Sequence, residues 1–178
     1  MNTAIRTPPT RPATRTWWRA CTRNVGAYGM TAVLGLGTMS AAVRGCGDDP
    51  PTPRERVIEI TNLRRDENDV APVRTNADLN RAAQLHSQDQ ADRDVMSHTG
   101  SDGSNAGQRI LRQGYRWITY GENVAAGYPT ASAVMRGWMN SAGHRRNILH
   151  PGFKDIGVGL ATSDDGTRYW TMVLASRG

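Results

Sequence analysis

Two histidines and one glutamate within residues 97–147 could share a site. His98 precedes a glycine-containing turn, Glu122 lies between Gly121 and Asn123 in a sequence typical of turns, and His144 follows a glycine at the expected start of a helical turn. Two imidazoles and a carboxylate can bind a divalent cation such as zinc and leave one coordination position for water. They can equally form a hydrogen-bonded cluster without a metal. The separations of 24 and 22 residues match no local metal motif, so the sequence leaves both hypotheses open.

The same three groups could support hydrolysis of peptide or ester bonds. Glu122 would be the general base toward a water held by a metal or by the histidines. Serine chemistry has less support, because the chain contains no Gly-x-Ser-x-Gly motif. Ser141 and His144 are three residues apart and could meet on one helical turn. Ser141 is also a natural N-cap for that turn, and we expect this structural role.

Other residues of similar chemistry are expected to be structural. His86 shares a helix face with Leu79, which predicts a half-buried packing histidine. His150 precedes a proline and is expected in a surface loop. Trp138 belongs to an apolar stripe and is expected in the core.

The elements that must position these groups follow from periodicity and capping. Apolar residues at helical spacing predict helices over about residues 54–68, 76–94, 105–114 and 130–139. Asn76, Asn105 and Thr130 are the expected N-caps, and Gln108 would complete a capping box with Asn105. Residues 156–162 and 169–175 predict strands joined by an Asp-Gly turn, and residues 117–120 could supply a third strand. The pattern predicts an α+β domain in which helices flank a small antiparallel sheet.

The first part of the chain has the pattern of an export signal. Residues 1–23 are rich in Arg, Thr and Pro, and residues 24–43 carry no charge. This layout predicts a secretory signal over residues 1–46, and a permanent membrane span is the alternative. Cys46 ends a segment similar to a bacterial lipoprotein cleavage box, although Arg44 departs from its usual small residue. Cys46 could be lipidated, or incidental in an ordinary signal peptide, and Met30 could be the true start. Residues 47–54 form a Pro-rich linker, and residues 55–178 form the folded domain.

Charge and cysteine content exclude several classes of protein. The formal net charge is +6, but residues 1–54 contain seven Arg against two acidic residues, and the rest of the chain contains 15 basic and 14 acidic residues. A nearly neutral domain argues against nucleic-acid binding. Both cysteines, Cys21 and Cys46, lie in the leader. The domain therefore has no disulfide, no thiolate zinc site and no cysteine nucleophile.

The motifs together resemble the CAP superfamily, also called the SCP or PR-1-like domain, in its bacterial secreted branch. The similarity covers roughly residues 55–176. Its strongest parts are Ser97-His98 with Asp102-Gly103, Gly121-Glu122-Asn123-Val124-Ala125, residues 138–149, and Ile156-Gly157-Val158-Gly159. The resemblance implies an α-β-α sandwich with a three-stranded antiparallel sheet.

The resemblance also implies a site. Many CAP members line a central cavity with two His and two Glu, and in some members these bind a divalent cation. By similarity, His98 matches the first His, Glu122 the first Glu and His144 the second His. The position of the second Glu is occupied here by Ser141. Because a neutral hydroxyl replaces one hard ligand, any metal is expected to bind more weakly than at the full set.

Family resemblance does not fix a function, since CAP members have been linked to lipid and sterol binding, defence, toxin, adhesion and occasionally proteolytic roles. We expect a non-enzymatic binding module outside the cell or in the cell envelope, with a possible membrane tether through Cys46. Its ligand would be a small molecule, a lipid or a weakly bound cation held in a cleft formed by His98, Glu122, His144 and Ser141. Hydrolysis at the same groups is the alternative, and a purely structural cluster is a third possibility.

Overall fold

The computed structural model describes residues 50–177. The predicted export signal over residues 1–46, including Met30 and Cys46, and the start of the linker lie outside these described residues. The described elements are five helices and four strands: α1 (Pro53–Asp66), β1 (Arg74–Thr75), α2 (Ala77–Arg93), α3 (Ala106–Arg112), β2 (Trp117–Ala126), α4 (Ala131–Asn140), α5 (Ala142–Ile148), β3 (Asp155–Thr162) and β4 (Arg168–Arg177). Within residues 50–177, no helix combines the length and the apolar character that crossing a membrane requires.

Side-chain caps set the starts of four helices. Asn76 accepts hydrogen bonds from the backbone N–H groups of the first turn of α2, and Thr130 does so for α4. Asn105 and Gln108 form the predicted capping box at α3. Thr52 and Glu55 form another at α1. The predictions for Asn76, Asn105 and Thr130 are confirmed, because these side chains satisfy amides that have no partner within the helix.

The sheet has four strands in the order β1-β3-β4-β2. β4 pairs antiparallel with both β2 and β3, whereas β1 pairs parallel with β3 through Arg74↔Asp155 and Thr75↔Ile156. The prediction of three strands, all antiparallel, is therefore wrong: the sheet is mixed. β1 has only two residues, both exposed, so it carries no alternation of polar and apolar residues that a sequence could display.

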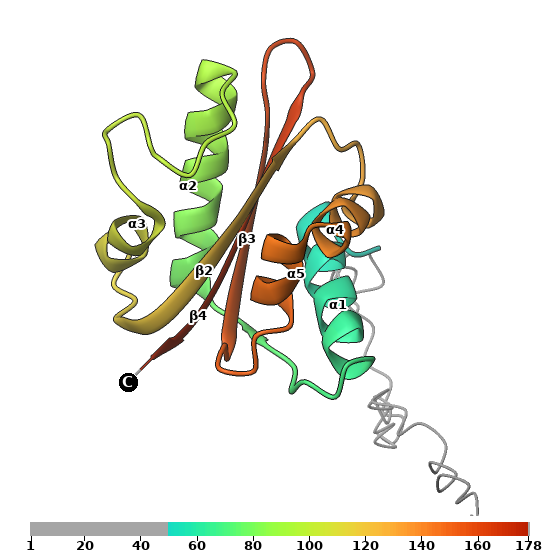
Figure 1. The fold of residues 1–178 in the computed structure, drawn as a ribbon. Helices are drawn as coiled ribbons and strands as arrows, with labels where there is room; N and C mark the ends of the chain where they lie inside the picture. Colours follow the sequence, from blue (N-terminus) through green and yellow to red (C-terminus); the bar gives the residue numbers. More distant parts are fainter. Residues whose placement is uncertain (1–49, 178) are drawn as a thin grey trace, which may run out of the picture. The chain divides into compact units, whose positions relative to one another are not determined.

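Helices cover both faces of the sheet, as Figure 1 shows: α2 and α3 lie on one side, and α1, α4 and α5 on the other. β4 is central and almost entirely buried, and its side chains alternate between the two cores. Trp170, Met172 and Leu174 belong to the core with α1, α4 and α5. Val173 and Ala175 belong to the core with α2 and α3. The predicted α-β-α sandwich is confirmed.

Helix α2 lies directly on β3 because the face of β3 that α2 covers carries glycines, which leave room for the helix backbone. A Cβ atom at Gly157 would come within 2.1 Å of the Leu79 carbonyl carbon, and one at Gly159 within 2.2 Å of the Ala83 carbonyl oxygen. Asn80 and Gln84 of α2 also hydrogen-bond to the backbone of β3 at Val158 and Leu160. These side chains satisfy the backbone groups of β3 beyond the short strand β1. The backbone of α2 is thereby fixed relative to the sheet.

The strand β2 is longer than the predicted residues 117–120 and includes Glu122. The expectation of a turn around Glu122 is wrong, since this residue pairs with Val173 of β4 in the middle of the strand. Gly121 is favoured by packing rather than by a turn, because an added Cβ would lie 3.0 Å from the Asn147 side chain and 3.1 Å from Phe153, and these side chains would have to shift. Glycine in a strand often marks such a close approach.

Candidate functional site

The carboxylate of Glu122 joins two cationic partners at the side of β2 that α3 covers. Its Oε1 accepts a hydrogen bond from Nδ1 of His98 at 2.8 Å, and its Oε2 accepts one from Nη2 of Arg109 at 2.7 Å. The Glu122 side chain is only 4% exposed, whereas the His98 side chain is 60% exposed. Both oxygens of a nearly buried carboxylate are therefore engaged, and the outermost member of the chain is an imidazole in contact with solvent.

The hydrogen bond to Glu122 determines the state of His98. A carboxylate oxygen only accepts, so Nδ1 of His98 carries the proton and Nε2 remains for another partner. The hydrogen bond that His98 donates to Glu122 raises the pKa of His98 above its ordinary value, against a smaller opposing effect of burial. The cationic form of His98 is thus populated to a higher pH than that of a free histidine.

Arg109 of α3 was not identified from the sequence. Besides Glu122, it donates to the carbonyl oxygens of Ser104 at 2.7 Å and His98 at 3.1 Å. It therefore fixes the loop that carries His98 and neutralises Glu122 at the same time. The one signal in the sequence is its position between the buried residues Ala106 and Ile110 on a short capped helix. An arginine on a buried face is uncommon unless it is paired.

His144 reaches the same region from α5, on the other side of the sheet. α5 docks on β2 through Asn123 and Asn147: the Asn123 amide donates to the carbonyl oxygen of His144 at 3.2 Å, and Asn147 donates to the Asn123 side chain at 2.9 Å. Within residues 50–177, the ring of His144 makes no hydrogen bond to Glu122 or His98. Burial and then repulsion from His98 lower the pKa of His144. His98 and His144 therefore interact only through charge. Of the three predicted groups, His98 and Glu122 are the two that are hydrogen-bonded to each other in the described part of the chain.

The last turn of α5 is anchored by Arg65 of α1, which is fully buried. Its guanidinium donates to the carbonyl oxygens of Ile148 at 2.7 Å, His150 at 3.0 Å and Phe153 at 3.2 Å. Burial lowers the pKa of Arg65, but the carbonyl groups compensate for part of the lost hydration. Arg65 thus holds the segment that positions His144.

Ser141 lies at the junction between α4 and α5 as the N-cap residue of α5, but its side chain makes no capping hydrogen bond. The predicted position is confirmed and the predicted role of the hydroxyl is wrong. Its backbone N–H bonds to the carbonyl of Trp138 instead. Among the described residues, Ser141 also makes no hydrogen bond to His144, so the two do not form a nucleophile–base pair.

These contacts do not suit a divalent cation. Both Glu122 oxygens are taken, the guanidinium of Arg109 is 2.7 Å from one of them, and a serine stands at the position of the second carboxylate. In the part of the chain that the structure describes, no three His, Cys, Asp or Glu side chains are grouped to hold a metal ion. A metal at His98, Glu122 and His144 would lie close to the guanidinium of Arg109, whose positive charge opposes it, so we derive no chemical step from a metal.

The other predicted structural residues lie as expected or deeper. Trp138 is 1% exposed in the core and His150 is exposed in a loop. His86 was expected to be half-buried but is only 1% exposed. Its Nε2 lies 2.8 Å from the carbonyl oxygen of Ser97, the residue before His98. His86 thus packs behind the loop that carries the site.

Comparisons with known proteins agree with this architecture. Residues 58–174 match the family model CAP, the cysteine-rich secretory protein family. The chain is 36% identical over 118 residues to YkwD, an uncharacterized protein of Bacillus subtilis, covering 66% of this chain and 45% of YkwD. An extracellular SCP-domain protein of Bacillus anthracis has 26% identity and a TM-score of 0.64, with 73% of this chain and 45% of that chain covered. An outer surface protein of Borrelia burgdorferi has 17% identity and a TM-score of 0.64, with 68% and 90% covered. The chain therefore spans less than half the length of the two Bacillus proteins.

Proposed function

The chain belongs to the cysteine-rich secretory protein (CAP) family, and on this premise we propose that it is an exported binding protein without catalytic activity. Its ligand is a small molecule or lipid that carries a carboxylate or phosphate group, bound at His98. The observation that carries the proposal is the chain of contacts Arg109–Glu122–His98, which orients an exposed imidazole and favours its charged form.

Charge balance at the site favours an anion. Arg109 neutralises Glu122, so a protonated His98 leaves a net positive charge at the surface. Nε2 of His98 is free to donate a hydrogen bond, and a charge-assisted bond to an anionic oxygen is stronger than a neutral one. His144 adds no competing negative charge. A cation would instead meet the positive charges of Arg109 and His98.

The same contacts argue against hydrolysis. A general base must reach the proton that it removes, and the Glu122 side chain is only 4% exposed, with Arg109 on one oxygen and His98 on the other, which leaves little access for a water. Within residues 50–177, no serine hydroxyl is hydrogen-bonded to a histidine side chain. Hydrolysis at Glu122 therefore stays the alternative hypothesis, and the variant Glu122→Gln tests it.

Export is part of the proposal and has two supports. The first is the order of a basic segment, residues 1–23, and an uncharged segment, residues 24–43. The second is the similarity to an extracellular protein of Bacillus anthracis. Mass spectrometry of the mature protein recovered from culture tests export and lipidation together, because acyl chains on Cys46 add a defined mass and a cut elsewhere removes Cys46.

Binding is tested by NMR titration of the full-length chain with hexanoate as a carboxylate probe and inorganic phosphate as a phosphate probe. We expect saturable shifts of the backbone amide signals of Thr99, which follows His98, and of Glu122, its hydrogen-bond partner. These shifts should be larger at about pH 6 than at about pH 8, because the imidazolium form of His98 binds the anion. His98→Gln should abolish these shifts. His150→Gln is the matched control, since His150 is also exposed but lies in another loop.

Saturation by hexanoate alone identifies a carboxylate ligand, and saturation by phosphate alone identifies a phosphate ligand. Shifts that persist in His98→Gln, or that His150→Gln removes equally, contradict the proposal. Turnover of a peptide or ester substrate that Glu122→Gln abolishes would replace it with the hydrolase alternative.

A further inference from the structure

A cavity lies between α2 and α3, behind the loop that carries His98. Its volume is about 280 Å³. The wall includes Ala82, Leu85, His86 and Asp89 of α2, the loop residues Gly100, Ser101, Asp102 and Ser104, and Arg109, Arg112 and Gln113 on the side of α3. A water molecule takes up about 30 Å³ in the liquid, so this space is several times larger than one water needs.

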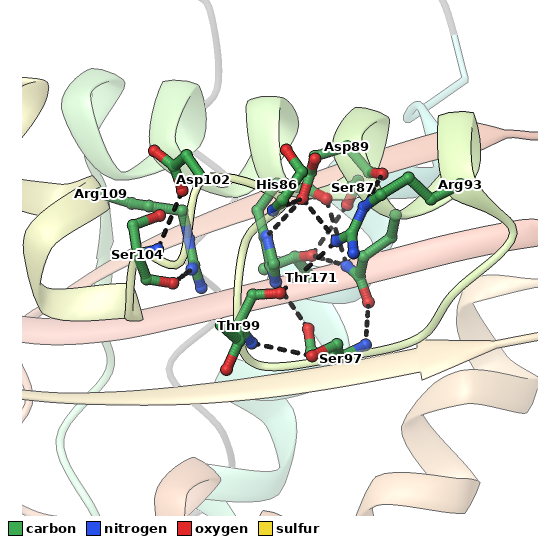
Figure 2. A network of polar contacts seen from close by, with 12 residues as sticks. His86, Ser87, Asp89, Arg93, Ser97, Thr99, Asp102, Ser104, Arg109 and Thr171 are labelled. Atoms are coloured by element: carbon green, nitrogen blue, oxygen red, sulfur yellow. Dashed lines mark hydrogen bonds and ion pairs between the residues drawn. The ribbon is translucent and has the colours of Figure 1, made fainter.

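Two buried polar atoms in this wall have no hydrogen-bond partner within residues 50–177, and the first is Nδ1 of His86. His86 is 1% exposed, and within residues 50–177 its Nδ1 makes no hydrogen bond. The nearest carboxylate oxygen, Oδ2 of Asp89, is 3.9 Å away, which is too far for a hydrogen bond. A buried polar atom without a partner is costly, and such atoms are uncommon in native proteins. Figure 2 shows the His86 ring between Asp89 and Ser97, with Asp102, Ser104 and Arg109 beside it.

The state of His86 determines what the atom requires. Nε2 faces the carbonyl oxygen of Ser97 at 2.8 Å, and a carbonyl only accepts, so Nε2 carries the proton. Burial lowers the pKa of His86 and keeps the ring neutral. Nδ1 is therefore an acceptor that lacks a donor. The hydroxyl of Ser104, which is 3% exposed, lies in the same wall and is also without a hydrogen bond in the described part of the chain.

The rest of the wall is balanced in charge and mixed in polarity. Asp89 is paired with Arg93, and Asp102 is paired with Arg112. Arg109 is paired with Glu122, so the lining carries no free net charge. Leu85, 55% exposed, and buried Ala82 supply an apolar side to the cavity. A ligand that matches this wall is neutral, offers several groups that both donate and accept, and has a C–H face for the leucine.

We propose that this cavity is a binding site for a single neutral sugar unit, with a ligand hydroxyl donating to Nδ1 of His86 and the C–H face of the ring against Leu85. Sugar hydroxyls donate and accept, which suits the histidine acceptor, the serine hydroxyl and the side chains of Arg112 and Gln113. The volume lies near the lower end of small-molecule sites and suits one ring rather than a chain of sugars. Arg109 is common to this wall and to the anion site, but the ligand contacts proposed here, at His86 and Leu85, are not those of His98, so either site can fail without the other.

The competing explanation is that ordered water alone fills the cavity and satisfies His86. Titration of the full-length chain at neutral pH distinguishes the two, with glucose and N-acetylglucosamine as probes and cyclohexanol as a probe of similar size that has one hydroxyl. The readout is the NMR shift of the backbone amides of Leu85, Ser104 and Gln113. We expect saturable shifts from one or both sugars with a Kd of roughly 1 mM, and none from cyclohexanol.

Two variants locate the binding. Leu85→Ala should weaken the affinity about tenfold by removing the apolar contact. Leu111→Ala is the matched control, because Leu111 is exposed to a similar degree on α3 but does not line the cavity. His86→Gln keeps a donor for the Ser97 carbonyl while removing the Nδ1 acceptor, and should also weaken binding about tenfold. A thermal melt of each variant shows whether it has kept its fold.

The proposal stands if sugar shifts saturate and are lost in Leu85→Ala but kept in Leu111→Ala. It is overturned if neither sugar shifts these amides at concentrations well above the millimolar range, which would assign the cavity to water. It is also overturned if cyclohexanol binds as well as the sugars, or if the shifts are the same in Leu85→Ala and Leu111→Ala. If His86→Gln fails to fold, the pair of leucine variants decides the question.

Discussion

The ion pair between Arg109 and Glu122 makes a strong quantitative prediction. The two side chains are 10% and 4% exposed and meet at 2.7 Å. Replacing Arg109 with Met keeps most of its aliphatic stem but leaves a buried carboxylate with one partner, which is His98. Removal of one partner of a buried ion pair typically costs about 3–5 kcal/mol of unfolding free energy. The loss should fall in this range because Arg109 also donates to the carbonyl oxygens of Ser104 and His98.

The matched control is Arg112→Met, three residues further along the chain. Arg112 is paired with Asp102, but both side chains are at least half exposed. Exposed ion pairs contribute about 0–1 kcal/mol, so this variant should be nearly neutral. The double variant Arg109→Met/Glu122→Gln removes both charges and should recover at least about 1 kcal/mol relative to the sum of the single variants.

Urea unfolding followed by tryptophan fluorescence measures these differences, because Trp138 and Trp170 are buried in the core and report its loss. The reasoning is refuted if Arg109→Met costs no more than Arg112→Met, or if the two substitutions at Arg109 and Glu122 are additive. Either result would mean that Glu122 is not held as a buried charge, and the basis for the proposed anion site would be lost.

Three further predictions concern packing, pH and metal. Gly159→Ala should lower the free energy of unfolding in urea by about 1–3 kcal/mol or more, because its Cβ would meet the backbone of α2. Gly143→Ala, whose Cβ would meet no neighbouring group within 4 Å, should leave that free energy unchanged or raise it slightly. The stability should decrease as the pH falls below about 6.5, because the unfolded chain binds a proton on His86 that the folded chain excludes; urea melts from acidic to neutral pH should show a weaker decrease in His86→Gln. His98 contributes in the opposite sense: its stabilisation is present below about pH 6.5 and is lost as the pH rises through its raised pKa. An NMR titration of Glu122→Gln should give a lower pKa for His98 than in the wild type. Zinc should leave the melting temperature unchanged, and a saturable increase that His144→Ala removes would show that the site does bind a metal.

The sequence alone was sufficient to predict most local structure. Asn76, Asn105 and Thr130 are the caps that it indicates, because capping depends on a side chain and an amide two or three residues away. The family motifs predicted the sandwich and the meeting of His98 with Glu122, which are 24 residues apart. These features follow from short-range chemistry or from resemblance, so no tertiary information was needed.

Only the tertiary structure decided the partners of Glu122 and the shape of the sheet. The glycine before Glu122 looked like part of a turn, yet Gly121 makes room for Asn147 and Phe153, which are distant in the sequence. Arg109 has no local feature that marks it as the counter-ion of Glu122, and β1 is too short to show an alternating pattern. The unpartnered Nδ1 of His86 likewise depends on how α2 and the loop after it pack together. Sequence patterns reflect interactions between residues that are close along the chain. The charge and the space around a side chain depend instead on segments that folding brings together.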